Sequence, residues 1–431
     1  MKKISTRAVS LLLIACLVLF GLGVFIVDDY NNGRKWALFF PTYNSAAEGR
    51  IVDRNGKELA YFNGAVSTFS SSPSARVANY HVTGDYWGRT GAGLISSYWE
   101  SSQNYDFIGG TTQATSSTLH LNIDSSVNEK AYELLSAAGK GCVMICNYRT
   151  GEVLCMVSAP SVDPLIDNAT PEDGAYINRC LSAAFTPGST FKLITSAAAI
   201  ENIANLGEFS FCCEEEYDIA GVKIKCTTAH GTENFEQALA NSCNCAFAKL
   251  TVNLGQDTMI KYVKDYGFLD SLEIDGIKTV PGTYPLDFVG DPELAWSGIG
   301  QSVDLVCPYA MLRYVSAIAN GGSVFTMHLV NTGDVPTSTA LVHPETAREL
   351  KRLMRNNVVS HYEGEINFPG LELCAKTGTA EQGDGTDHSW FVGFLDDEEH
   401  PYAFVSLVEN GGFGLWTAGL MMNELLQYMV N

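Results

Sequence analysis

The sequence predicts an α/β architecture in which one antiparallel sheet is assembled from strands at both ends of a large domain. Two apolar, strand-like runs lie early in that domain, at 141–147 and 152–158, separated by a turn. Three further runs of the same kind lie late, at 371–380, 389–394 and 402–409. The chain between the two groups has mostly helical patterning, which indicates a helical region inserted between the strands of one sheet.

The amino terminus predicts a membrane anchor. Three basic residues precede an apolar run of 19 residues at 9–27, and about 20 such residues span a bilayer as a helix. Because basic flanks stay inside, we expect 1–8 to be a cytoplasmic tail, 9–27 a single transmembrane helix, and the rest extracytoplasmic. The Leu-Ile-Ala-Cys sequence that ends at Cys16 looks like a lipoprotein cleavage site, so a lipoprotein remains an alternative. The apolar run, however, continues for eleven residues beyond Cys16.

The segment at 29–120 predicts a small, β-rich, membrane-proximal pedestal domain. It is rich in Ser, Gly, Asn and Tyr, and Asn55-Gly56 is typical of a hairpin turn between strands at 49–53 and 58–62. The main domain then occupies 121–431. Its predicted helices are 124–138, capped by Asp124, then 189–203, 234–254, 309–319 and 415–429.

Composition excludes some functions. The chain has 431 residues, of which 46% are hydrophobic and 17% charged, as in a globular protein. Its formal net charge of −21 argues against nucleic acid as a partner, because phosphate binding requires a basic surface.

The cysteines leave two alternatives open. Cys212, Cys213, Cys226 and His230 together have the residue types of a zinc site, but the loose spacing and the adjacent cysteines argue against one. A disulfide from Cys226 to Cys212 or Cys213 is the preferred interpretation for an exported loop. We therefore expect no metal at these residues.

The first chemical motif is Ser-x-x-Lys, with Ser189 and Lys192 at the start of a predicted helix. This spacing puts the hydroxyl and the amine on one face, one turn apart. Serine is a weak nucleophile and requires a nearby base, which a deprotonated lysine provides. Alone, the motif is equally compatible with an ordinary helix cap.

Two more motifs follow in order. Ser242 and Asn244 form a Ser-x-Asn element within the predicted helix 234–254, with a hydroxyl for proton relay and an amide for a peptide. Lys376, Thr377 and Gly378 form a Lys-Thr-Gly strand whose cation and hydroxyl suit a carboxylate. Each could be a simple structural element, but the ordered set of three is associated with penicillin-binding proteins and class A β-lactamases.

The chain resembles the class B penicillin-binding proteins over essentially its whole length. The further segments that carry the likeness are 50–60, 150–154, 185–192, His230-Gly231, Ile299-Gly300-Gln301 and 388–393. The resemblance implies a β-lactamase/transpeptidase-like domain with a five-stranded antiparallel sheet, flanking helices and a helical lobe. Two features depart from the family: the chain is short for class B, and Ser302 stands where glycine is more usual.

The resemblance also implies a reaction. Ser189 would attack the carbonyl of the penultimate D-alanine of a peptidoglycan stem peptide, with Lys192 as the base. Ser242 would return a proton to the leaving amine, and a second stem peptide would accept the acyl group. β-Lactams would acylate the same serine, and no metal or organic cofactor would be needed.

The other implied roles concern substrate binding. Asn244 would hold the substrate amide, while Lys376, Thr377 and Thr379 would hold its terminal carboxylate. Gly378 would leave room for the substrate backbone, and the backbone N–H groups of Ser189 and Thr379 would form an oxyanion hole. The family further suggests a polytopic glycosyltransferase of the SEDS family as a partner.

Alternatives remain. A D,D-carboxypeptidase, which passes the acyl group to water, carries the same motifs. A non-catalytic β-lactam sensor or scaffold of wall synthesis is a second possibility, although a sensor requires a cytoplasmic signalling segment and a degenerate scaffold lacks motif residues. A β-lactamase would need a deacylating base, and a class A penicillin-binding protein would need an additional glycosyltransferase domain.

Overall fold

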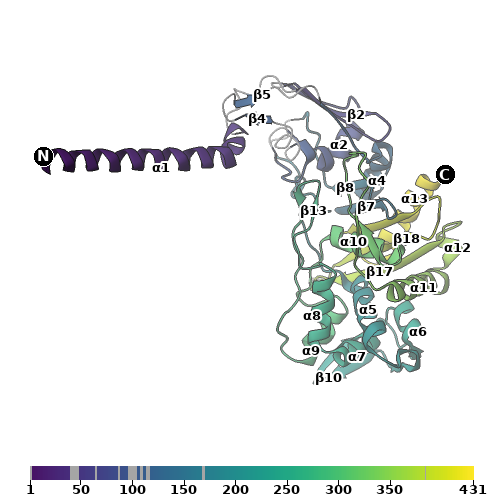
Figure 1. The fold of residues 1–431 in the computed structure, drawn as a ribbon. Helices are drawn as coiled ribbons and strands as arrows, with labels where there is room; N and C mark the ends of the chain where they lie inside the picture. The colour runs from purple at the N-terminus through teal and green to yellow at the C-terminus, as the bar shows by residue number, and fades with distance from the viewer. Residues whose placement is uncertain are drawn as a thin grey trace.

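The computed structural model describes residues 2–38, 48–63, 66–85, 88–95, 104–106, 110–112, 117–166, 170–383 and 385–431. Its largest described sheet confirms the predicted assembly from both ends of the domain (Figure 1). The strand order is β17-β18-β19-β7-β8, and all neighbouring pairs are antiparallel. The bounds are β7 Gly141–Asn147, β8 Val153–Ala159, β17 Leu373–Glu381, β18 Asp387–Leu395 and β19 Tyr402–Val408. Each predicted strand is therefore present, with ends within two residues of the expected ones.

The two groups of strands meet at the centre of the sheet. Strand β19 pairs with β7 from Tyr402↔Asn147 to Val408↔Gly141. Gly141 is required at this pairing because a Cβ there would lie 2.0 Å from the carbonyl oxygen of Leu407. The early hairpin is thus joined to the late strands by a continuous ladder.

Helices cover both faces of the sheet, as the alternation of its buried side chains requires. Val143 and Ile145 pack in one cluster with α4 (Ser125–Ala138) and α13 (Leu420–Val430). The predicted cap of α4 is confirmed, since the Asp124 carboxylate accepts the N–H groups of Ser126 and Val127. The predicted final helix, 415–429, begins as a π-helical turn, η4 (Leu415–Gly419), before α13.

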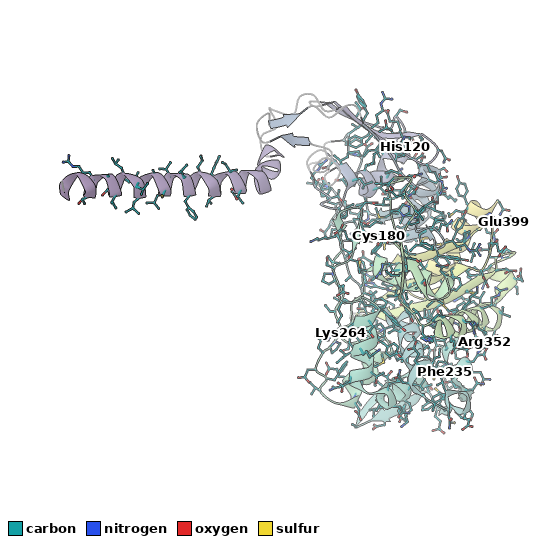
Figure 2. All side chains as sticks on the ribbon, viewed as in Figure 1. His120, Cys180, Phe235, Lys264, Arg352 and Glu399 are labelled. Carbon is teal, nitrogen blue, oxygen red and sulfur yellow. The ribbon has the colours of Figure 1, made fainter. Side chains whose placement is uncertain are left out.

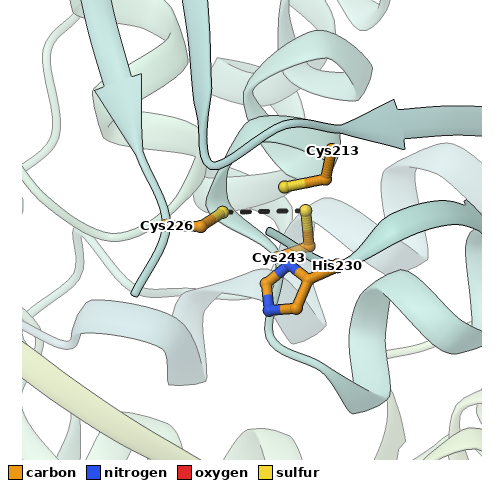
Figure 3. A group of neighbouring side chains, drawn as sticks. All are labelled: Cys213, Cys226, His230 and Cys243. Carbon is orange, nitrogen blue, oxygen red and sulfur yellow. Dashed lines mark hydrogen bonds between the residues drawn. The ribbon is translucent and has the colours of Figure 1, made fainter. Parts of the chain in front are cut away.

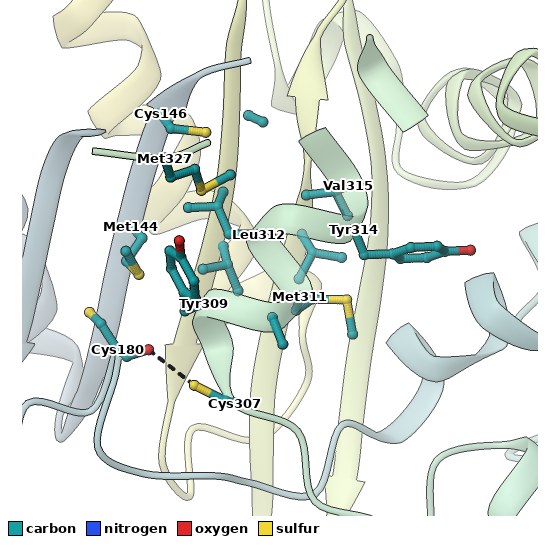
Figure 4. Close-up of a cluster of buried hydrophobic side chains, with 14 of the residues drawn as sticks. Met144, Cys146, Cys180, Cys307, Tyr309, Met311, Leu312, Tyr314, Val315 and Met327 are labelled. Atoms are coloured by element: carbon teal, nitrogen blue, oxygen red, sulfur yellow. Dashed lines mark hydrogen bonds between the residues drawn. The ribbon is translucent and has the colours of Figure 1, made fainter. Parts of the chain in front are cut away.

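The opposite face packs against α10 (Pro308–Ala319), which confirms the helix expected at 309–319. Figure 4 shows Tyr309 and Leu312 of α10 beside Met144 of β7, in the larger apolar cluster. The Cys307 thiol, just before α10, donates to the carbonyl of Cys180 at 3.4 Å. These cysteines act as small core residues.

The inserted helical region forms the lower part of the view in Figure 1. Its elements are η2 Gly188–Phe191, α5 Lys192–Asn202, η3 Leu206–Glu208, β9 Ser210–Cys213, β10 Glu216–Ile219, β11 Val222–Lys225, β12 Gly231–Asn234, α6 Phe235–Ala240, α7 Asn244–Leu254, α8 Gln256–Asp265 and α9 Asp291–Gly298. Strand β9 pairs with β12 and β10 with β11, both antiparallel. Between α8 and α9 lie β13 Glu273–Ile274 and β14 Ile277–Lys278, and after α10 come β15 Ser323–Phe325, β16 Ser338–Ala340, α11 Pro344–His361 and α12 Gly364–Asn367.

The prediction of a single helix at 234–254 is wrong. The structure breaks it into α6 and α7, and the intervening Ser242 has a positive φ of 54°. A helix cannot continue through this left-handed conformation. Cys243 then caps α7, its sulfur accepting the N–H of Ala246.

The small amino-terminal sheet has the order β3-β2-β1-β6. Its strands are β1 Glu48–Val52, β2 Glu58–Asn63, β3 Val66–Phe69 and β6 Ser117–His120, accompanied by α2 Pro73–Thr83 and the short pair β4 Asn104–Asp106 and β5 Gly110–Thr112. The predicted hairpin of β1 and β2 is confirmed, with Gly56 at a φ of 80° in its turn. Part of the segment expected to form a pedestal lies outside the described residues.

The predicted apolar helix is also present. Helix α1 runs from Lys2 to Leu38 and contains a stretch at Thr6–Asp28 with a mean hydropathy of 2.9, long enough to cross a membrane. Figure 2 shows side chains projecting around the described part of the helix, and the large apolar residues between Val9 and Val27 are exposed. An apolar helix of this kind is consistent with an anchor or a signal.

Candidate active site

Ser189 lies in the 3₁₀ turn η2, immediately before α5 begins at Lys192. The α-helix therefore starts three residues later than predicted, at Lys192, but Ser189 and Lys192 still face each other. The Lys192 Nζ atom lies 3.1 Å from the Ser189 Oγ atom. Ser189 is partly exposed whereas Lys192 is fully buried, so a substrate reaches the hydroxyl while the amine stays out of water.

The Ser-x-Asn element surrounds the same amine. Lys192 donates to the carbonyl oxygen of Ser242 at 2.5 Å and to the Asn244 Oδ1 atom at 2.7 Å, and its Nζ lies 3.2 Å from the Ser242 Oγ. A neutral amine has two N–H donors and one lone pair. The two carbonyl-type oxygens account for both donors, which leaves the lone pair for a hydroxyl proton.

The break between α6 and α7 makes these contacts possible. The positive φ of Ser242 turns both its carbonyl oxygen and its hydroxyl toward Lys192. Backbone strain of this kind at a non-glycine residue commonly occurs where a side chain must be aimed at a functional site. The Asn244 Nδ2 group donates to the carbonyl of Lys225 at 2.8 Å, which fixes the amide orientation.

Lys376 brings strand β17 into the same cluster. Its Nζ donates to the Ser242 Oγ and to the carbonyl oxygen of Thr377, each at 2.9 Å. Ser242 therefore lies between two buried amines, Lys192 and Lys376. This arrangement can pass a proton from one side of the site to the other.

Burial controls the charge of both lysines. Removal from water disfavours an ammonium ion, and burial lowers the pKa of Lys192 to about 8. Burial, and then the charge of Lys192, lower the pKa of Lys376 well below its ordinary value. A lysine with a pKa near neutrality can act as a general base, which an exposed lysine cannot.

The remaining predicted substrate-binding residues lie along β17. Thr377 and Thr379 are partly exposed, whereas Gly378 between them is buried. The Thr377 Oγ1 lies 3.2 Å from the Tyr362 hydroxyl, and the Thr379 Oγ1 accepts the N–H of Gly414 at 3.3 Å. All eight residues predicted for the site therefore lie on three neighbouring elements: the η2–α5 junction, the α6–α7 break and β17.

Close backbone packing holds η2 against β17. A Cβ on Gly188 would lie 2.6 Å from the carbonyl oxygen of Thr379, and Gly188 has a φ of 53°. Gly188 also donates to the carbonyl of Gly300 at 2.9 Å. The next turn contains Ser302 at a φ of 74°, which explains why glycine would suit that position.

Two supporting contacts escaped the sequence analysis. The Trp390 indole of β18 donates to the carbonyl of Thr186 at 2.9 Å, next to η2. The Tyr362 hydroxyl, at the end of α11, contacts the hydroxyl of Thr377 and accepts the backbone N–H of Thr377. Trp390 lay in a segment of family likeness, but no local pattern marks Tyr362, because its contact depends on how α11 packs against β17.

Gly378→Ala is expected to disrupt the site through packing. An added Cβ would lie 2.8 Å from the Thr190 Cγ2 and 2.9 Å from the Pro187 carbonyl oxygen. We expect the free energy of unfolding to fall by about 1–3 kcal/mol, together with a slower reaction at Ser189. Thermal denaturation and β-lactam acylation measure the two effects. Gly207→Ala is the matched control, since its Cβ would meet nothing within 4 Å, and equal behaviour of the two variants would contradict this packing argument.

Comparison with known proteins agrees with this geometry. Residues 141–427 match the model of the penicillin-binding protein transpeptidase domain. Stage V sporulation protein D of Bacillus subtilis is 31% identical over 289 residues, which cover 61% of this chain and 44% of that protein. The peptidoglycan D,D-transpeptidase PbpA of Mycobacterium tuberculosis is 28% identical over 349 residues, covering 69% of each chain.

A solved structure shows the same fold. Penicillin-binding protein A of M. tuberculosis, as its ceftriaxone acyl-enzyme complex, has a TM-score of 0.78 at 23% identity, covering 91% of this chain and all of that one. The matching family model and the D,D-transpeptidase relative identify a serine acyl-transfer enzyme. The chain belongs to the penicillin-binding protein transpeptidase family, and its class is that of the peptidoglycan D,D-transpeptidases.

Proposed function

We propose that this chain cross-links peptidoglycan stem peptides through an acyl-enzyme on Ser189, and that β-lactams acylate the same residue. The observation that carries the proposal is the buried Lys192 amine, which contacts Ser189, Ser242 and Asn244 at once. Such a cluster activates a serine without a metal or an organic cofactor.

These contacts support the following residue roles. Lys192 takes the proton as the Ser189 Oγ attacks the carbonyl of the penultimate D-alanine. The backbone N–H groups of Ser189 and Thr379 stabilise the developing oxyanion, supported by the close approach of η2 and β17. Ser242, hydrogen-bonded to Lys376, then returns a proton to the D-alanine that leaves.

Substrate binding uses the edge of β17. Lys376, Thr377 and Thr379 bind the terminal carboxylate of the stem peptide, and Asn244 binds its amide. A peptide that contacts these side chains must replace or share the Tyr362 and Lys225 contacts of Thr377 and Asn244. The amine of a second stem peptide then attacks the acyl-enzyme and releases Ser189.

The chain organisation supports a role at the membrane. In this proposal residues 1–8 are cytoplasmic, 9–27 cross the membrane once, 29–120 form the pedestal and 121–431 form the extracytoplasmic catalytic domain. The apolar stretch Thr6–Asp28 and the basic residues before it support that orientation. A polytopic SEDS-family glycosyltransferase is the partner suggested for the span and the pedestal. Co-purification from detergent tests it, and failure with every candidate counts against it.

The acceptor distinguishes this proposal from its runner-up. Full-length protein in detergent is incubated with a donor peptide ending in D-Ala-D-Ala and with an amine acceptor, and the products are quantified by mass spectrometry. A transpeptidase forms the donor–acceptor amide as it releases D-alanine. Release of D-alanine with hydrolysed donor alone indicates a D,D-carboxypeptidase, and no release from folded protein indicates a scaffold.

The pH dependence tests the assigned base. Because burial lowers the pKa of Lys192 to about 8, its neutral, proton-accepting form predominates above that pH. We expect the rate of penicillin acylation to fall about tenfold for each pH unit below 8 and to level off above it. Stopped acylation reactions analysed by intact-protein mass give this profile. A rate that stays constant from about pH 6 to about pH 9 would contradict Lys192 as the base.

A further inference from the structure

A group of metal-binding side chains lies directly behind the Ser-x-Asn element. Cys213, Cys226, His230 and Cys243 place their ligand atoms within 4.8 Å of one another (Figure 3). Cys213 ends β9, Cys226 follows β11, His230 precedes β12, and Cys243 caps α7. Antiparallel pairing of Gly231 with Cys213 brings the first and third of these segments together. Four separate segments therefore converge on one point.

The structure alters the set of residues considered from the sequence. Cys212 is exposed and lies outside the group, whereas Cys243 takes its place. The expected disulfide from Cys226 to Cys212 or Cys213 is absent, because all twelve cysteine thiols are free. Only one of the two adjacent cysteines, Cys213, belongs to the group, so their adjacency does not argue against zinc.

The spacing suits a tetrahedral ion. Zinc binds thiolate sulfur at about 2.3 Å, so two sulfurs of a tetrahedral site lie about 3.8 Å apart. The Cys226 and Cys243 sulfurs are 3.8 Å apart. Figure 3 shows the sulfurs of Cys213, Cys226 and Cys243 directed toward one another, with the His230 ring beside Cys243.

Backbone N–H groups at the start of α7 are directed at two of the sulfurs. The Cys226 sulfur accepts the backbone N–H of Cys245 at 3.5 Å, and the Cys243 sulfur accepts that of Ala246 at 3.4 Å. Such donors at a helix start stabilise thiolates. The His230 Nδ1 atom is buried and, among the described residues, has no hydrogen-bond partner. A buried ring nitrogen without a partner costs free energy, which coordination of a cation offsets.

We propose that Cys213, Cys226, His230 and Cys243 bind one zinc ion. Three sulfurs and one imidazole nitrogen form a closed, four-ligand set, which is that of a structural rather than a catalytic zinc site. The ligands are soft, which favours zinc over magnesium or calcium. The three cysteines are at most 9% exposed, so the ion is shielded from solvent.

The ion has a consequence for the active site, which rests on the proposed function. Cys243 lies between Ser242 and Asn244, both of which contact Lys192. Ser242 is held at a positive φ that an unconstrained chain avoids. Zinc bound to Cys243 anchors this break to β9 and the β11–β12 loop, and so acts as a positioning element for Ser242 and Asn244.

Metal content is the first test. The full chain is purified in detergent through a tag that binds no metal, incubated with zinc sulfate, dialysed, and analysed by inductively coupled plasma mass spectrometry. We expect one zinc per chain. Cys213→Ser is expected to lose it, whereas Cys212→Ser, which changes the adjacent exposed thiol, is expected to retain it.

A second measurement, on the unmodified protein, tests the site even if the ligand variants do not fold. Cobalt(II) exchanged into the unmodified protein should give the intense d–d and sulfur-to-cobalt absorption of a tetrahedral thiolate site. Absence of zinc and of this spectrum in folded protein overturns the proposal. So does a disulfide joining Cys226 to Cys243 or to Cys245, whose sulfur is 3.5 Å away. Equal zinc loss from Cys212→Ser and Cys213→Ser overturns the ligand set.

The positioning role has its own readout. Zinc removal by a chelator is expected to slow penicillin acylation about tenfold or more, since small displacements of reacting groups have large effects, and added zinc should restore the rate. If the protein binds zinc but its acylation rate does not change when the zinc is removed, the positioning role alone is overturned. Bound zinc without acylation under any condition contradicts the proposed function and leaves the metal site in place.

Discussion

Ser189→Ala is expected to abolish covalent attachment of a β-lactam, lowering acylation by at least about 10³-fold. Ser189 carries the hydroxyl that is both partly exposed and within 3.1 Å of the Lys192 amine. Ser242 also contacts that amine, but its hydroxyl oxygen is already bonded to Lys376. Incubation with a penicillin and measurement of the intact mass over time give the result directly.

The matched control is Ser196→Ala on the same helix, α5. Ser196 is fully buried, and among the described residues its hydroxyl has no hydrogen-bond partner, so its loss leaves the site intact. We expect this variant to form the adduct at the rate of the unmodified protein. An adduct of undiminished yield on Ser189→Ala would exclude Ser189 as the nucleophile.

Lys192→Met is expected to slow acylation by about 10²- to 10⁴-fold, the contribution of a general base. Methionine has a similar length and no charge, so it fits a fully buried position without the cost of an unpaired ion. The variant should therefore remain folded and still bind penicillin, but react with it slowly. Stopped-time intact-mass measurements give the rate, and a thermal melt confirms folding.

Lys249→Met on α7 is the control for removing a lysine near the site. Lys249 is partly exposed and belongs to the helix that follows the Ser-x-Asn element. Its acylation rate should be unchanged. A Lys192→Met variant that is folded and reacts as fast as this control would show that another group accepts the proton.

The sequence predicted the large sheet well because its strands carry local signals. The runs that became β7, β8 and β19 are almost entirely buried on both faces, so their apolar character is continuous and easy to recognise. Their joining into one sheet, by the pairing of β19 with β7, followed from grouping strands across the helical insert.

Local backbone breaks were harder to predict. The helix at 234–254 seemed continuous because Ser242 has no glycine or proline beside it, yet its positive φ splits the segment. For the same reason, the metal site considered from the sequence contained Cys213, Cys226 and His230 but not Cys243, and it was judged unfavourable. Cys243 was treated as part of a helix, whereas the break places it with Cys213, Cys226 and His230. These contacts depend on tertiary packing that no periodicity records.

The three motifs that meet at the candidate site were recognised because each is short and their order is distinctive. The contact of Lys376 with Ser242, 134 residues apart, could be expected only from the resemblance to a family and not from local pattern. Tyr362, which contacts Thr377, carried no signal at all.

Peptide mapping of the β-lactam-labelled protein tests the central claim most directly. Full-length protein is incubated with a penicillin, digested, and analysed by tandem mass spectrometry to locate the added mass. We expect one adduct per chain, on Ser189. An adduct on Ser242 or another serine, or no adduct on protein shown to be folded, would contradict it.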